Sequence, residues 1–98
     1  MCEKNPGMQR LGRTYDAAQS GIRAVKATDD GQRLKVTVLC ENIDFQSFKC
    51  GDTIENLVVP DSGILTGVIC GIARKTDAAG ETLNSFEFLP EYYSIEPV

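Results

Sequence analysis

Four cysteines carry the most reactive side chains of this chain, and their spacing limits the chemistry they can support. Cys2, Cys40, Cys50 and Cys70 form no CxxC pair, and the 98 residues include no histidine. A zinc site would need four thiolates without the usual paired ligands, and a thiolate nucleophile would lack an imidazole base. The pattern therefore predicts no metal site and no cofactor.

The cysteines are better explained as packing residues, with a disulfide as the open alternative. Cys40 and Cys70 are in phase with apolar strand residues, and we interpret them as small core side chains. Cys50 precedes a Gly-Asp turn and is expected to be partly exposed.

Three other patterns could carry chemistry, and each has a plainer interpretation. Asp29 and Asp30 are adjacent acids followed by a glycine, a combination typical of a hairpin turn rather than an acid–base pair. The glycines of GVICGIA do not have a phosphate-cradling spacing, and no helix follows them. Tyr92 and Tyr93 are predicted to pack on an edge strand rather than to stack a base or sugar. We therefore expect no enzymatic activity.

Charge is distributed unevenly along the chain, whose net charge is −4. Residues 1–26 contain five basic and two acidic side chains, a charge of +3, and residues 27–98 contain five basic and twelve acidic ones, a charge of −7. An acidic body repels phosphate, so nucleic acid is not an expected partner. No apolar run approaches the roughly 18 residues of a membrane span, so no membrane partner is expected either.

Residues 1–20 are predicted to form an extended N-terminal arm, because glycine and proline interrupt them and no hydrophobic period is sustained. A basic arm on an acidic body fits a segment that docks on an acidic protein surface, and a solvated terminus is the alternative. Arg10 and Arg13 can pair with carboxylates through two hydrogen bonds each, and Tyr15 adds rigid contact area. These three are the predicted partner-binding residues.

Residues 21–98 are predicted to form a single β-domain that begins with a hairpin. Residues 21–28 and 33–40 are strand-like and are separated by an Asp-Gly turn, a strong hairpin signal. In the second of these strands apolar and polar residues alternate, which predicts one buried face.

A second hairpin is predicted between residues 62 and 90. Neither alternating face of residues 64–73 is polar, so this run is expected to form one long strand covered on both sides. A turn over residues 74–81 and a return strand over 83–89 follow, with Phe86 directed into the core. Five residues are predicted to be largely buried: Val36, Val38, Val68, Cys70 and Phe88.

The remaining segments complete an all-β fold. Residues 53–59 predict a short strand closed by a turn at Pro60, and Ile95 with the tyrosine pair predicts a last edge strand. In residues 41–49 the apolar side chains follow neither the helical nor the strand period. The count is five to seven short antiparallel strands, which predicts a small barrel or sandwich with an extended N-terminal arm.

Residues 51–90 follow a distinctive order of turns and strands. A Gly51-Asp52 turn precedes a short strand, a glycine-spaced Val/Ile strand follows at 67–73, and a TDAAGE turn at 76–81 leads to a return strand that ends in Phe-Leu-Pro at 88–90. This layout resembles that of small bacteriophage head-decoration, or capsid cement, proteins.

The resemblance implies a non-enzymatic virion structural protein that binds and stabilises the outer surface of a phage capsid. Its partners would be the capsid shell or neighbouring subunits, and both a monomer and a homo-oligomer remain open. Such a protein is made in the bacterial cytoplasm and ends in the virion, and the N-terminus shows no apolar secretory segment. The alternative is a small phage or bacterial intracellular module that binds and inhibits one host protein. An oligonucleotide-binding barrel is disfavoured by the acidic body.

Overall fold

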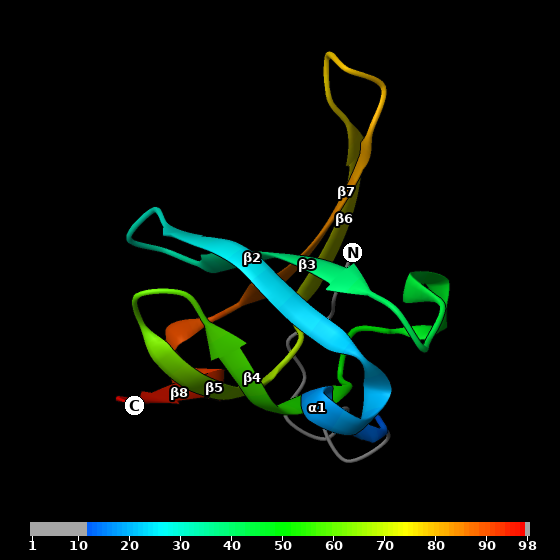
Figure 1. The fold of residues 1–98 in the computed structure, drawn as a ribbon. Coiled ribbons are helices and arrows are strands. Elements are labelled where there is room, and N and C mark those ends of the chain that lie inside the picture. Colours follow the sequence, from blue (N-terminus) through cyan, green and yellow to red (C-terminus); the bar gives the residue numbers. More distant parts are fainter. Residues whose placement is uncertain (1–11, 98) are drawn as a thin grey trace.

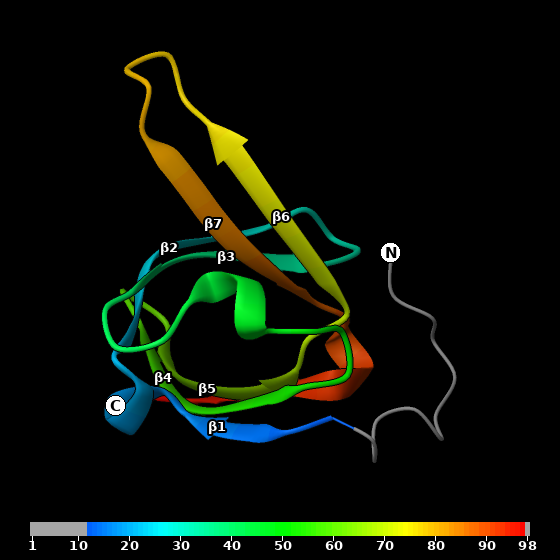
Figure 2. The same cartoon turned by 90° about the vertical axis from the view of Figure 1, so that its right-hand side faces the viewer.

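Two four-stranded β-sheets make up the fold in the computed structural model, which describes residues 12–97. Sheet A has the strand order β1-β4-β5-β8, and sheet B has the order β2-β3-β7-β6. Figures 1 and 2 show the two sheets as facing layers. The elements are β1 (Thr14–Asp16), α1 (Ala17–Ser20), β2 (Ile22–Asp29), β3 (Leu34–Cys40), η2 (Phe45–Ser47), β4 (Thr53–Val59), β5 (Gly63–Val68), β6 (Gly71–Thr76), β7 (Thr82–Phe88), η3 (Pro90–Tyr92) and β8 (Tyr93–Glu96).

The predicted all-β class is confirmed, and the architecture is a small sandwich. The described residues form eight strands, more than the five to seven expected. Of their strand pairs, β1 with β4 is parallel and the others are antiparallel. The higher count has two sources, an unexpected strand β1 and the division of one expected strand into two.

The predicted first hairpin is present as β2 and β3, which pair antiparallel from Ile22 opposite Cys40 to Asp29 opposite Leu34. Its turn is stabilised by its own acids, because the Asp29 carboxylate accepts from the Gly31 N–H at 2.8 Å. This is the Asx-type turn that Asp-Gly sequences favour. A β-bulge interrupts the ladder between Ala24 and Lys26.

The expected single long strand in the second hairpin is wrong. The apolar run forms β5 in sheet A and β6 in sheet B, and the chain crosses between the sheets at Ile69 and Cys70. The Ile69 N–H donates to the Asp52 carbonyl at 2.8 Å, whereas the Cys70 N–H donates to the Glu87 carbonyl at 2.8 Å. Two successive residues therefore bond to different sheets, which ends one strand and begins the next.

Only one face of β5 is buried, and this corrects two expected core positions. Leu65 and Ile69 are 0% and 1% exposed, while Val68 and Cys70 are half-buried. Gly67 lies on the inner face, where a Cβ atom would meet the Tyr93 Cβ at 2.5 Å. Glycine at this position therefore allows β8 to pack closely against β5.

Strands β6 and β7 form the predicted antiparallel hairpin around a turn at residues 77–81. Gly80 in that turn has φ +86°, a conformation that favours glycine. Figures 1 and 2 show the outer part of this hairpin projecting beyond the two-layer body. The side chains from Arg74 to Thr82 are exposed.

Part of the expected N-terminal arm belongs to the folded body. Residues 1–11 lie outside the described part of the chain, but β1 runs parallel to β4 with Tyr15 opposite Ile54. Helix α1 follows, and its residue Ala17 is 1% exposed. The Arg13 N–H also donates to the Asp52 carboxylate at 2.9 Å. The folded domain therefore begins at or before Thr14, not at residue 21 as expected.

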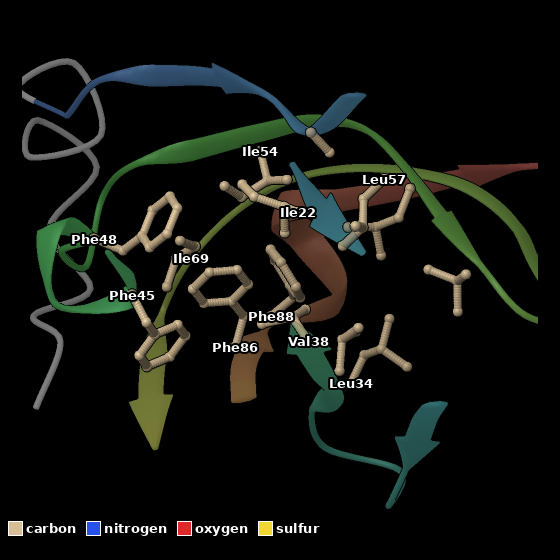
Figure 3. Close-up of a cluster of buried hydrophobic side chains, with 14 residues drawn as sticks. Ile22, Leu34, Val38, Phe45, Phe48, Ile54, Leu57, Ile69, Phe86 and Phe88 are labelled. Atoms are coloured by element: carbon tan, nitrogen blue, oxygen red, sulfur yellow. The ribbon is translucent and has the colours of Figure 1, made fainter. Parts of the chain in front are cut away.

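A cluster of aromatic and aliphatic side chains fills the space between the sheets (Figure 3). Val36, Val38, Phe86 and Phe88 are each at most 1% exposed, as predicted. The segment without a clear period also contributes, because η2 and the residue after it bury Phe45 and Phe48 against Phe86 at centroid distances of 5.2 and 5.0 Å. Within residues 12–97, no helix has the length and apolarity needed to cross a membrane.

Candidate functional site

The three predicted partner-binding residues do not form one surface in the described structure. Arg10 lies outside the described residues. The Arg13 side chain is exposed, whereas the Tyr15 ring is half-buried and packs edge-on against Phe48 at a centroid distance of 4.8 Å. Tyr15 therefore contributes to the core packing, and Arg13 is the described member of the set that presents its charge to solvent.

The surroundings of the cysteines and of the Asp29-Asp30 pair are those of packing and turn residues. Cys40 and Cys70 are half-buried free thiols at the margin of the core, and Cys50 is disulfide-bonded. Burial, reinforced by the Asp44 carboxylate, raises the pKa of Cys40 to about 11. The Asp30 carboxylate accepts from the backbone of Gln32 and Arg33, and these bonds lower its pKa. Residues 12–97 contain no group of three or more side chains arranged to hold a metal ion.

The most distinctive surface is a groove on the face of sheet B that points away from sheet A. Its volume is about 320 Å³. All four strands of the sheet contribute, and the register joins Lys26, Thr37, Ser85 and Ala73 in one row across them. The groove is lined by Lys26, Thr28, Lys35, Thr37, Ala73, Lys75, Leu83 and Ser85. We call this set the sheet B groove.

Two hydroxyl groups lie at the centre of the sheet B groove. Thr37 and Ser85 are only 6% and 7% exposed although they face away from the core. Their oxygens are 3.5 Å apart, so one hydroxyl donates weakly to the other. The accepting hydroxyl keeps its own proton, and no acceptor for that proton lies among the described residues. The centre of the groove therefore presents a hydrogen-bond donor to a bound group.

Three lysines line the same groove as these hydroxyls. Lys26, Lys35 and Lys75 are exposed, and none of them forms an ion pair with a described acidic residue. The acid nearest in register, Glu87, is instead bound to Arg33 at 2.7 Å, and this hydrogen bond raises the pKa of the guanidinium. The charge left on the groove is positive, although the chain as a whole is acidic.

A backbone irregularity places one of these lysines in the groove. In regular alternation Lys26 would share the inner face with Ile22 and Ala24. The bulge at Val25 shifts the register, so that Lys26 lies opposite the outward Thr37. Bulges commonly redirect a side chain in this way. The sequence places lysines on β2, β3 and β6 and small hydroxylated residues on β2, β3 and β7, but these residues become a site only once the register of four strands is known.

A second recess, of about 390 Å³, lies where α1, β2 and β4 meet. Its lining is mostly apolar, and Val58 at its edge is 60% exposed. The Asn56 amide at the rim donates to the Asp16 carboxylate at 3.2 Å. The recess is lined by Ala18, Ile22, Arg23, Ala24, Asn56, Val58 and Pro60. Its chemistry differs from that of the sheet B groove, since it offers apolar contact rather than charge.

Comparison with known proteins finds no matching family model, no curated protein of matching sequence and no solved structure of matching fold. The functional argument therefore rests on the geometry described above.

Proposed function

We propose that this chain is a non-enzymatic protein-binding domain that attaches to an acidic protein surface through the sheet B groove. The observation that carries the proposal is the convergence of three lysines on one concave surface without acidic partners among the described residues. Like charges held near one another repel, and a partner that supplies carboxylates removes that repulsion. The hydroxyl donor at the centre of the groove also suits a carboxylate of the partner.

The groove favours a protein partner over a nucleic acid. Its lining contains no aromatic side chain on which a base could stack, and base stacking supplies much of the affinity of single-stranded nucleic-acid sites.

The resemblance of residues 51–90 to capsid cement proteins gives this proposal its setting. We propose that the acidic surface is the outside of a phage capsid and that the chain is a virion structural protein. In this arrangement Arg10 and Arg13 contact the shell or a neighbouring subunit. Tyr15 holds β1, the strand that follows Arg13, at the edge of sheet A.

Mass photometry and co-sedimentation with candidate capsid shells test this function. We expect saturation at a fixed stoichiometry per shell, with binding that weakens as salt is raised. The triple variant K26E/K35E/K75E should bind at least about tenfold more weakly, equivalent to about 1.4 kcal/mol.

The charge-matched comparison is between each single variant, K26E, K35E or K75E, and K49E, which makes the same Lys-to-Glu change at an exposed lysine outside the groove. Equal binding by the triple variant and the native protein would refute the role of the groove. A discrete complex with one soluble host protein, and no binding to shells, would favour the inhibitor function instead.

A further inference from the structure

We infer that the free edge of β6 takes up an extended acidic segment of the partner as a fifth strand of sheet B. This inference rests on the proposed function and specifies the form of the partner. It joins two observations that are independent of each other, an unpaired sheet edge and the cationic groove beside it.

The edge of β6 is accessible. This strand is the last in the order of sheet B, so within residues 12–97 one side of its backbone has no neighbouring strand. Figure 2 shows β6 as the right-hand strand of the projecting hairpin, whose tip points away from sheet A. The exposed side chains of β6 are Ile72, Arg74, Lys75 and Thr76.

The register identifies the backbone groups that a new strand would meet. The Asp77 N–H donates to the Glu81 carbonyl at 2.9 Å, which makes this a hydrogen-bonded pair. Because such pairs alternate along an antiparallel ladder, Lys75 and Ala73 also bond to β7. The N–H and C=O groups of Ile72, Arg74 and Thr76 then point to the free edge. Three alternate residues are therefore available for pairing.

The side chains of β6 define what the added strand must carry. Ala73 and Lys75 lie on the groove face, so residues opposite them would project their side chains over the groove. A carboxylate opposite Lys75 faces that lysine directly. A carboxylate opposite Ala73 reaches past the small alanine side chain toward the rest of the groove. On the other face, Ile72 is 36% exposed and favours an apolar neighbour. The expected segment has acids at alternate positions and an apolar residue at the end near Ile72.

The charges on β6 also determine which kind of strand can pair with its free edge. Lysine and arginine on an edge strand prevent pairing with a second copy of the same edge, because like charges would lie opposite each other. Arg74 and Lys75 have this effect here, and an acidic strand is the partner that they attract. A nucleic acid cannot use the edge, since it has no peptide backbone to pair with the N–H and C=O groups.

A synthetic peptide tests the inference directly. The probe is Ac-Thr-Glu-Thr-Glu-Val-Thr-NH2, which in antiparallel pairing places its two glutamates opposite Lys75 and Ala73 and its valine opposite Ile72. The measurement is amide hydrogen exchange by NMR on the full-length protein at low ionic strength. At saturation, exchange at Ile72, Arg74 and Thr76 should slow at least tenfold, while the edge strand β8 of sheet A should be unchanged.

N-methylation of the peptide separates strand pairing from charge. Methyl groups on the central threonine and the valine remove two of the three N–H groups that face β6, and should lower the affinity at least tenfold. The matched control carries the methyl groups on the two glutamates, whose N–H groups face away, and should bind like the parent. Replacing both glutamates by glutamine should also lower the affinity at least tenfold.

The results distinguish this inference from the proposed function. If both N-methylated peptides bind like the parent, charge alone holds the segment, and strand addition is refuted while the groove keeps its role. If no acidic peptide slows exchange at the edge, strand addition is likewise refuted. The shell-binding assay with K26E/K35E/K75E decides the proposed function separately.

Discussion

Val36 and Thr37 are neighbours on β3 and are both nearly inaccessible, at 0% and 6% exposed, yet they face opposite sides of sheet B. Val36 lies opposite Phe86 and points into the sandwich, whereas Thr37 lies opposite Ser85 and points away from it. The core covers the first pair. The second pair lies among the residues that line the sheet B groove, three of which are lysines.

This difference separates two kinds of burial. Inside the sandwich, Phe86 contacts Phe45 and Phe48 at 5.2 and 5.0 Å, and Phe48 in turn contacts Tyr15 of sheet A. Outside it, the neighbouring residues of the groove include three exposed lysines, whose long side chains keep their charged ends in water. The inner face should therefore respond to mutation through stability, and the outer face mainly through binding.

The largest expected effect comes from removing a large side chain from the core-facing side of sheet B. Phe86→Ala removes a fully buried ring that contacts three other phenylalanines, so the free energy of unfolding should fall by about 3–5 kcal/mol. Urea denaturation followed by circular dichroism measures this change. A loss below about 1 kcal/mol would contradict the assignment of this face as the core.

Exchanging valine and threonine between the two faces gives a more specific test with a smaller expected change in stability. Val36→Thr places an unpaired hydroxyl among apolar side chains and should cost about 1–3 kcal/mol. Thr37→Val at the next position removes one partner of the pair with Ser85, and the stability should change by less than about 1 kcal/mol in either direction. The two variants have almost the same volumes, so side-chain size does not explain the difference. Equal losses in both would show that the two faces do not differ.

Local signals were enough to predict the first hairpin, the turn between β6 and β7, and the core-facing residues of β3 and β7. The Asp-Gly turn between β2 and β3 is built from side-chain bonds within the turn itself, and the alternation along β3 identifies Val36 and Val38. Phe86 and Phe88 follow from the same alternation on β7. In each case the deciding interactions lie within a few residues of one another in the sequence.

The features that were missed depend on partners far away in the sequence. The break between β5 and β6 is fixed by bonds from Ile69 to Asp52 and from Cys70 to Glu87, and a continuous apolar run gives no sign of it. β1 has only three residues and acquires its register from β4. The groove needs the register of four strands and one bulge, so its lysines are unremarkable in the sequence.

The smallest expected effect concerns Cys40, at the margin of the inner face. Burial and the Asp44 carboxylate raise its pKa from 9.0 to about 11, so the folded protein holds the thiol proton more tightly than the unfolded chain does. Below pH 9 the thiol is protonated in both states, and its contribution to stability is fully present. As the pH rises from 9 to 11 the unfolded chain loses the proton first, so the free energy of unfolding falls.

The change should stay below about 1 kcal/mol, because solvent reaches a half-buried group and screens it. The pKa values of Cys70 and Tyr93 are also raised by burial, so the absolute pH profile does not isolate one residue. The difference between the native protein and Cys40→Ala does, when urea denaturation is measured at pH 8, 9, 10 and 10.5 under otherwise equal conditions. The free energy of unfolding of the native protein should fall more steeply than that of the variant only above pH 9. Parallel profiles over the whole range would show that Cys40 lies on the solvent side of the margin, and the inner face would then end at Val38.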